Sequence, residues 1–204
     1  MSEKTSERKL PTSSINIRML SLNRPQEIRA ILESNIINGQ HLPIISEIEA
    51  VIKRMHDSVN NPDNFPRFLV ATSSDGAVAG VMGLNRINED LINRGIDAET
   101  TIEIINAYVD TNITRNGVGG ELLTNLRHIA VTLGFKRVAV ISGPRFKEKG
   151  HEFWTKHFGK PIDTLKSYYG DGNDAKLWLY QLPEANFYKP DMSPSLGNTA
   201  LEHK

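Results

Sequence analysis

The chain of 204 residues contains no cysteine, which excludes disulfides, thiolate nucleophiles and cysteine-ligated zinc. It also lacks an excess of either charge, since Lys plus Arg and Asp plus Glu number 24 each. No basic field therefore favours a nucleic acid or an anionic membrane as partner. No stretch approaches the ~18 apolar residues of a membrane span, and the polar start MSEKTSERKLPTSS lacks the apolar core of a signal peptide. These absences favour small-molecule chemistry and predict a cytoplasmic protein.

Composition and length predict one folded domain. Hydrophobic residues make up 39% of the chain, which is enough for a substantial core at this length. Residues 1–14 are polar and are expected to form a mobile N-terminal segment. The stretch 183–204 contains three prolines and no apolar period, so it is expected to be a tail beyond the domain. The domain itself is expected to span 15–182.

Apolar periodicity predicts alternating strands and helices. Strands are expected at 15–20, 67–72, 77–87, 101–109, 135–141, 164–169 and 175–182. Helices are expected at 25–38, 44–59, 118–133 and 148–158. A polar loop is expected at 88–100, and an Asp-Gly pair at 75–76 predicts a hairpin. This order predicts an α/β fold with a mixed sheet and helices on its faces, in which the strands on either side of the helix 118–133 are parallel neighbours.

The stretch TRNGVGGELL, residues 114–123, places three glycines at the start of an amphipathic helix. Each glycine destabilises a helix interior by roughly 1 kcal/mol relative to alanine, so a role other than helix stability is expected. A strand that ends in such a turn and opens a helix directs several N–H groups and the positive end of the helix dipole to one place. We therefore predict a phosphate or pyrophosphate ligand. The dinucleotide fingerprint G-x-G-x-x-G fails because Leu122 stands at the third glycine position, and no P-loop motif occurs.

The same stretch resembles the acetyl-CoA loop of the Gcn5-related N-acetyltransferases, the GNAT superfamily, which reads Gln/Arg-x-x-Gly-x-Gly/Ala. Gly117 and Gly119 match the two small positions, whereas Thr114 stands where the family has Gln or Arg, and the adjacent Arg115 is offered as the positive charge. The resemblance covers 15–182 and is most specific over 103–159. It implies a mostly antiparallel mixed sheet of about seven strands, helices on both faces and a central βαβ unit that binds acetyl-CoA as co-substrate.

The resemblance also implies which residues contact the cofactor. The pantetheine arm would pair with main-chain groups at the end of the strand 101–109, as an added strand would. The N–H groups of the glycine turn would hold the pyrophosphate. The cofactor-binding residues implied in this way are Tyr108, Val109, Asp110, Thr114, Arg115, Asn116, Gly117, Val118, Gly119 and Gly120.

Transfer of an acetyl group to an amine requires a base that removes the ammonium proton. Glu103 is the candidate, because it lies six residues before Val109 in a position that resembles the base glutamate of the histone-modifying branch. A period of two would put Glu103, Ile105, Ala107 and Val109 on one face of the strand. Asp110 and a bound water are the alternatives to Glu103.

The acid that protonates the departing thiolate is where the sequence departs from the family pattern. The stretch GHEFWTKHFG, 150–159, resembles the late family segment A-x-x-F-Y-x-x-x-G-F, but Trp154 stands where the tyrosine belongs. An indole N–H is no useful acid, so Trp154 is predicted to be a packing residue. Tyr168 or Tyr169 is the candidate acid, with water-assisted departure or loss of turnover as alternatives.

Metal chemistry is not expected. The run HEFWTKH differs from the zinc motif H-E-x-x-H, since Thr155 stands at the second histidine position. His151 and His157 are predicted to lie on the surface of a short helix.

The leading hypothesis is an acetyl-CoA-dependent N-acetyltransferase that acts directly on the primary amine of a small molecule or peptide. A non-catalytic module that binds acetyl-CoA or CoA is the main alternative, and an unrelated phosphate-binding α/β domain is the third. Acceptor specificity is expected to come from 25–60, 88–100 and the closing hairpin. No nucleic-acid or membrane partner is expected, and a homodimer is left open.

Overall fold

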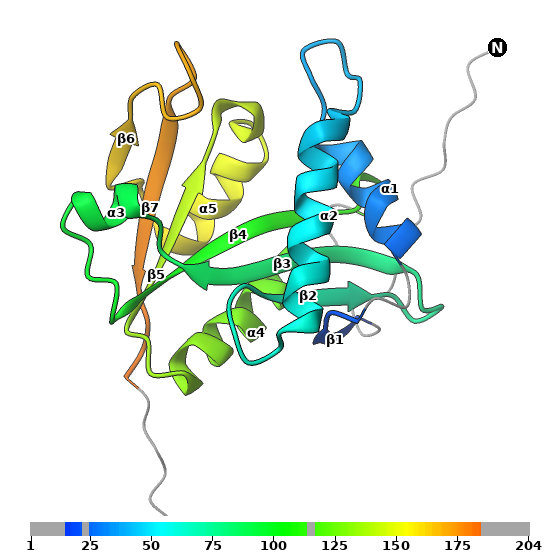
Figure 1. Cartoon of the computed structure of the whole chain (residues 1–204), viewed down its shortest axis with the longest axis horizontal. Coiled ribbons are helices and arrows are strands. Elements are labelled where there is room, and N and C mark those ends of the chain that lie inside the picture. Colours follow the sequence, from blue (N-terminus) through cyan, green and yellow to red (C-terminus); the bar gives the residue numbers. More distant parts are fainter. Residues whose placement is uncertain (1–14, 22–24, 114–116, 185–204) are drawn as a thin grey trace, which may run out of the picture.

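The structure, a computed structural model, describes residues 15–21, 25–113 and 117–184 (Figure 1). Its strands are β1 (Asn16–Met19), β2 (Arg67–Thr72), β3 (Val78–Arg86), β4 (Thr101–Val109), β5 (Arg137–Ser142), β6 (Asp163–Leu165) and β7 (Ala175–Gln181). Its helices are α1 (Pro25–Asn35), α2 (Ile45–Asn60), α3 (Glu89–Asn93), α4 (Val118–Thr132) and α5 (Gly150–Phe158). Every strand and helix predicted from the sequence is present, and α3 is an addition.

All seven strands form one sheet in the order β1-β2-β3-β4-β5-β7-β6. Each neighbouring pair is antiparallel except β4 and β5, which are parallel and are joined through α4. The expected mixed, mostly antiparallel sheet with a central βαβ unit is therefore confirmed. None of the helices within the described ranges is long and apolar enough to cross a membrane.

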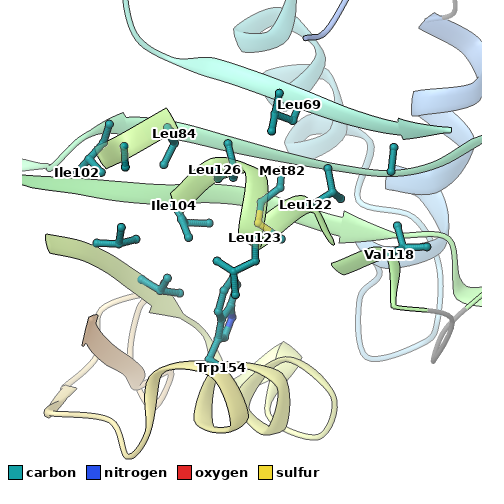
Figure 2. Packing of buried hydrophobic residues seen from close by; sticks show 14 of the residues in the cluster. Leu69, Met82, Leu84, Ile102, Ile104, Val118, Leu122, Leu123, Leu126 and Trp154 are labelled. Atoms are coloured by element: carbon teal, nitrogen blue, oxygen red, sulfur yellow. The ribbon is translucent and has the colours of Figure 1, made fainter. Parts of the chain in front are cut away.

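Helices cover both faces of the sheet. On one face α1 and α2 bury an apolar cluster that includes Leu32, Ile48 and Phe68, and α3 extends this layer over β5 and β7 through Leu91. On the other face α4 and α5 bury a second cluster. Figure 2 shows Trp154 of α5 reaching into this cluster toward Leu123 and Met82.

A β-bulge interrupts β4 at Asn106. The pairing with β3 shifts between Val81↔Tyr108 and Gly83↔Ile105, and Asn106 has a φ of 49°, a left-handed conformation that asparagine tolerates better than most residues. Before the bulge, Ile105 packs on the α1–α2 side. After it, Tyr108 packs on that side, whereas Ala107 and Val109 pack on the α4 side. The prediction that Glu103, Ile105, Ala107 and Val109 share one face is therefore wrong beyond Ile105.

Two local predictions also need correction. The predicted strand 164–169 ends at Leu165, and the chain then turns, with Ser167 at a φ of 49°. The predicted loop 88–100 contains α3, because the Asn88 side chain accepts a hydrogen bond of 3.1 Å from the N–H of Leu91 and caps the helix. The acidic pair that follows Asn88 is the first-turn signal for such a helix.

Candidate functional site

The site lies where β4 and β5 separate. The two strands pair only from Thr101↔Arg137 to Ile104↔Val140, although β4 continues to Val109 and β5 to Ser142, along β7. Figure 1 shows β5 rising away from β4 beyond this point. Among the described residues, the β4 edge from Ile105 to Val109 therefore has no strand partner on the β5 side, and all five of its residues are partly exposed. Such an edge can pair with an extended ligand.

The glycine turn opens α4 beside this edge. Gly117 has a φ of 81° and is the N-cap of α4, a conformation that glycine adopts without strain. The first hydrogen bond of the helix joins the N–H of Glu121 to the carbonyl oxygen of Gly117 over 3.0 Å. The N–H groups of Val118, Gly119 and Gly120 thus have no acceptor within the helix. Thr114, Arg115 and Asn116 lie outside the described residues.

The two glycines inside the first turn of α4 differ in their surroundings. A Cβ at Gly119 would lie 3.1 Å from the Phe153 ring, so this glycine is needed where α4 packs against α5. A Cβ at Gly120 would meet only Cε1 of His157, at 3.9 Å, which is ordinary contact. Internal packing therefore does not account for Gly120. Main-chain donors without an acceptor in the helix fit an anionic group at this helix end.

The end of β4 shows where the other predicted cofactor residues lie. The Val109 carbonyl oxygen accepts a hydrogen bond of 3.0 Å from Nδ2 of Asn35, and the Asp110 N–H donates to the Ala79 carbonyl oxygen over 2.9 Å. The Asp110 carboxylate accepts from the N–H of Asn112 over 2.9 Å at the 3₁₀ turn Thr111–Ile113. This carboxylate holds the local turn, which argues against Asp110 as the base.

Glu103 is the buried carboxyl group of the site. It lies in the paired part of β4, between Asn85 of β3 and Ala139 of β5, and is 8% exposed. Burial raises its pKa to about 7, against the opposing effects of a hydrogen bond from the Asn88 N–H and the positive charge of Arg54. A carboxyl group with this pKa exchanges a proton near neutral pH, as a general base must.

Two tyrosines lie within electrostatic range of Glu103. Tyr168 accepts a hydrogen bond of 2.9 Å from Nδ2 of Asn88, and burial and the Glu103 charge raise its pKa. Tyr169 packs edge-on against Tyr168 at 4.9 Å and against the backbone of Gly143 at the end of β5. Surrounding protein atoms and the charges of its neighbours raise the Tyr169 pKa to about 12. The structure thus brings Glu103, Tyr168 and Tyr169 together on one side of the sheet.

Tyr108 lies on this same side. Burial raises its pKa, and Asn106 is its hydrogen-bond partner. Its ring packs edge-on against Phe146 at 6.3 Å, in the 3₁₀ turn Pro144–Phe146. The Tyr108 side chain therefore lies on the Glu103 side of β4, and only its main chain remains available to the cofactor role implied by the sequence.

Sequence reasoning missed five polar residues around these tyrosines. They are Glu47, Arg54, Asn88, Asn106 and Arg145. Arg145 makes a two-point ion pair with Glu47, at 2.7 and 3.0 Å, which links α2 to the turn after β5. Arg54 donates from Nη1 to Oδ1 of Asn106 over 2.9 Å. An asparagine inside an otherwise β-branched and aromatic strand was the available signal for the bulge at Asn106.

The helix α5 contributes packing. Trp154 is 5% exposed and packs edge-on against Phe153 at 4.8 Å, which confirms its prediction as a packing residue. His151 departs from the predicted surface position, since its half-buried ring lies 5.3 Å from the Trp178 ring, with Nε2 3.1 Å from the Gly143 carbonyl oxygen. His157 is also half-buried, and burial lowers its pKa. Across the described ranges no group of three or more His, Asp or Glu is arranged to hold a metal ion.

Comparison with known protein families gives one family match. The model of the acetyltransferase (GNAT) family matches residues 39–159, more than half of the chain. The matched region includes α2, the site strands β4 and β5, the glycine turn and α5. No curated protein sequence matches this chain significantly.

Solved structures share the fold. A protein of Desulfovibrio desulfuricans assigned to the GNAT family has a TM-score of 0.67 at 16% identity, covering 83% of this chain and 100% of its own. An N-acetyltransferase of Staphylococcus aureus Mu50 has a TM-score of 0.62 at 20% identity, covering 84% of this chain and 100% of its own. The yncA protein of Salmonella typhimurium, whose structure contains acetyl-CoA, has a TM-score of 0.59 at 16% identity, covering 85% of this chain and 97% of its own. At these identities the likeness concerns the fold.

Proposed function

The chain belongs to the acetyltransferase (GNAT) family, and from that premise we propose that it transfers an acetyl group directly to the primary amine of a small molecule or peptide. The protein is an acyltransferase, and acetyl-CoA is its co-substrate. The observation that carries the proposed mechanism is the buried carboxyl of Glu103, whose pKa of about 7 suits proton transfer near neutrality.

The chain's own groups are well suited to hold the co-substrate. Acetyl-CoA supplies an acyl group that is activated as a thioester. The N–H groups of Val118, Gly119 and Gly120, which have no acceptor within α4, would hold its diphosphate at the positive end of the helix, beside Gly117. Main-chain groups of the unpaired β4 edge, from Tyr108 to Asp110, would hold its extended arm. Thr114, Arg115 and Asn116 remain part of this proposal on the strength of the sequence resemblance.

Glu103 acts as the general base. A primary amine resembles the lysine side chain, whose pKa is about 10.4, so it arrives mainly as an ammonium ion that cannot attack a carbonyl carbon. The Glu103 carboxylate takes the proton, directly or through a water, and leaves the nitrogen lone pair free. The Asn88 N–H keeps the carboxylate oriented while this happens. The carboxyl group can then release the proton because its pKa lies near the surrounding pH.

Tyr168 is the better placed of the two candidate acids. Its oxygen accepts the hydrogen bond from Asn88, so its own O–H is free to donate to the departing sulfur. Its raised pKa keeps the phenol protonated at neutral pH. Tyr169 packs against it and is the second candidate.

The assay of thiol release tests this function. Purified protein is incubated with acetyl-CoA and a panel of primary amines and peptides, and free CoA is measured together with the acetylated product. Release that depends on the amine supports the enzyme. Tight binding of acetyl-CoA without release across the panel would instead support the non-catalytic module, which is favoured by the buried Trp154 at the family's tyrosine position.

The cytoplasmic location and a homodimer stay predictions. Fractionation of cells that express the tagged chain tests the first, and sedimentation of the purified protein tests the second.

A further inference from the structure

The arginines around Glu103 differ in whether a carboxylate pairs with them. Three arginines act on the pKa values of Glu103, Tyr108 or Tyr168, namely Arg54, Arg94 and Arg145. Arg94 is paired with Asp163 at 3.0 Å, and Arg145 with Glu47 at 2.7 Å. No carboxylate lies within 4.0 Å of Arg54 in the described part of the chain. Arg54 therefore brings an unneutralised positive charge to the base.

Arg54 is nevertheless held in place. Its Nη1 donates to Oδ1 of Asn106 over 2.9 Å, and Asn106 also hydrogen-bonds Tyr108. A guanidinium carries five N–H donors in a planar fork. Among the described residues one of them is engaged, by Asn106, and this bond directs the guanidinium toward the sheet. The anchor is the bulge residue on the unpaired β4 edge, three residues after Glu103. An arginine on an exposed helix face normally stays in solvent, whereas this one is tied to the side of the sheet that holds the base.

From this arrangement we propose that Arg54 binds a carboxylate of the acceptor, so that the substrate is an amino acid or another amine with a carboxylate a few bonds from its nitrogen. This inference rests on the proposed function, since it concerns the amine that Glu103 deprotonates. The planar fork of Arg54 matches a carboxylate through two parallel hydrogen bonds. An acceptor with a second ammonium group would instead meet the positive charge of Arg54 and bind weakly.

Asp90 is the competing charge. It lies on α3, acts on Tyr168 and is exposed. Asp90 belongs to the first turn of α3, where an acidic residue is stabilised by the helix dipole without any ligand. Within the ranges that the structure describes, no hydrogen bond ties its carboxylate to the Glu103 side of the sheet. Arg54 is the charge that a hydrogen bond anchors on this side of the sheet. We therefore expect the second group of the acceptor to be acidic and not basic.

The test compares acceptors in matched sets. Leucine, phenylalanine, β-alanine and γ-aminobutyrate are each assayed against their own carboxamide and against the alkylamine that lacks the carboxylate. Rates are corrected for the fraction of free amine. At least one carboxylated acceptor should exceed its carboxamide and alkylamine about tenfold or more in kcat/KM. Equal rates within every set, or faster turnover of the carboxamide or alkylamine than of the acid throughout, would overturn the proposal.

Variants at Arg54 separate recognition from structure. R54Q removes the charge and keeps a polar side chain, so it should abolish the preference by raising KM for the acid, whereas the change in the Glu103 pKa affects the acid and its amide alike. R54K should retain part of the preference. K53Q removes the neighbouring cation, which pairs with Asp57 on the exposed side of α2, and should change nothing. A preference that survives in R54Q would exclude Arg54 as its source.

A binding measurement separates this inference from the proposed function. The N-acetylated acid that corresponds to the best acceptor, or N-acetyl-leucine if no amine is turned over, is titrated calorimetrically into the protein with CoA present. It should bind the original protein about tenfold more tightly than R54Q. If no amine releases thiol but this difference is found, the proposed activity fails while the carboxylate subsite stands. If both proteins bind it equally, the subsite is refuted.

Discussion

The side-chain amide of Asn88 donates a hydrogen bond of 2.9 Å to the phenol oxygen of Tyr168. The backbone N–H of the same asparagine donates to the carboxylate of Glu103, and its side-chain oxygen caps α3. One residue thus holds the proposed base, the proposed acid and the short helix beside them.

Replacing Glu103 with Gln should lower kcat/KM at neutral pH by a factor of about 100 or more, because a positioned base typically contributes that much. Binding of acetyl-CoA should be unchanged, since Glu103 lies in the paired part of β4. In the original protein kcat/KM should rise with pH through an apparent pKa of about 7, the value at which Glu103 loses its proton. Steady-state kinetics measured over roughly pH 5 to 9, where proteins are commonly stable, would reveal both the loss of rate and the pH dependence.

The control for this substitution is Glu152→Gln, on the exposed side of α5, which should leave the pH profile unaltered. A Glu103→Gln variant that keeps full activity would remove Glu103 from the mechanism.

Glu103 should also make stability depend on pH. Its pKa is raised from 4.5 when unfolded to about 7 when folded, so the folded state favours the protonated form. The free energy of unfolding should therefore fall as the pH rises from the unfolded to the folded pKa, by about 3 kcal/mol in total. Glu103→Gln keeps a neutral side chain at every pH. Relative to the original protein it should be more stable at pH 8, and this advantage should vanish near about pH 4.

Urea unfolding at several pH values measures this difference. A constant difference between the two proteins across the range would mean that Glu103 ionises as freely in the folded state as in the unfolded chain.

The glycines of the α4 turn should respond differently to alanine. Gly120→Ala meets no close neighbour, so it should leave the fold intact or stabilise it by up to about 1 kcal/mol. The added methyl group would still obstruct an approaching diphosphate and weaken acetyl-CoA binding. Gly119→Ala should destabilise the protein, because its Cβ would lie 3.1 Å from the Phe153 ring.

Thermal melting with and without acetyl-CoA separates the two effects. If Gly120→Ala bound acetyl-CoA as tightly as the original protein, the diphosphate would have to lie elsewhere.

Tyr168→Phe should reduce kcat by about tenfold or more with little change in the acceptor KM, because it removes the proton donor and leaves the ring packing. Tyr169→Phe should have the smaller effect, since no hydrogen bond orients its hydroxyl in the described structure. Asn88→Asp keeps an acceptor for the α3 cap but cannot donate to Tyr168. It should lower kcat and move the pH profile upward, as the added negative charge raises the Glu103 pKa.

Comparison of kcat and KM for the three variants measures these effects. A larger loss in Tyr169→Phe than in Tyr168→Phe would exchange the roles assigned to the two tyrosines.

Much of the fold could be predicted because the signals are local. The apolar stripe of α4 ends near Gly134, and the Asp-Gly hairpin joins β2 to β3. Each of these patterns determines its own segment. The βαβ order then places β4 beside β5. The cap formed by Asn88 is also local, but the five-residue α3 is too short to show a helical period.

The arrangement of the site could be predicted only in part. Glu103 could be chosen from its strand position, but its raised pKa depends on burial in the folded sheet, where it lies between β3 and β5. The ion pair between Glu47 and Arg145 joins residues 98 positions apart, so no local pattern reveals it. The sequence predicts Tyr168 and Tyr169 at the end of a strand in the closing hairpin, whereas a turn after Leu165 positions them.

The extra residue at Asn106 has a geometric consequence for the whole site. Glu103 and Tyr108 are five positions apart, an odd spacing that would send their side chains in opposite directions along a regular strand. The bulge absorbs one residue of β4, so Glu103 and Tyr108 face the same side although their spacing is odd. The residue that absorbs this step, Asn106, is also the hydrogen-bond partner of Arg54. A single irregularity in one strand therefore lets an acidic group and a phenol face the same guest and places a guanidinium beside them.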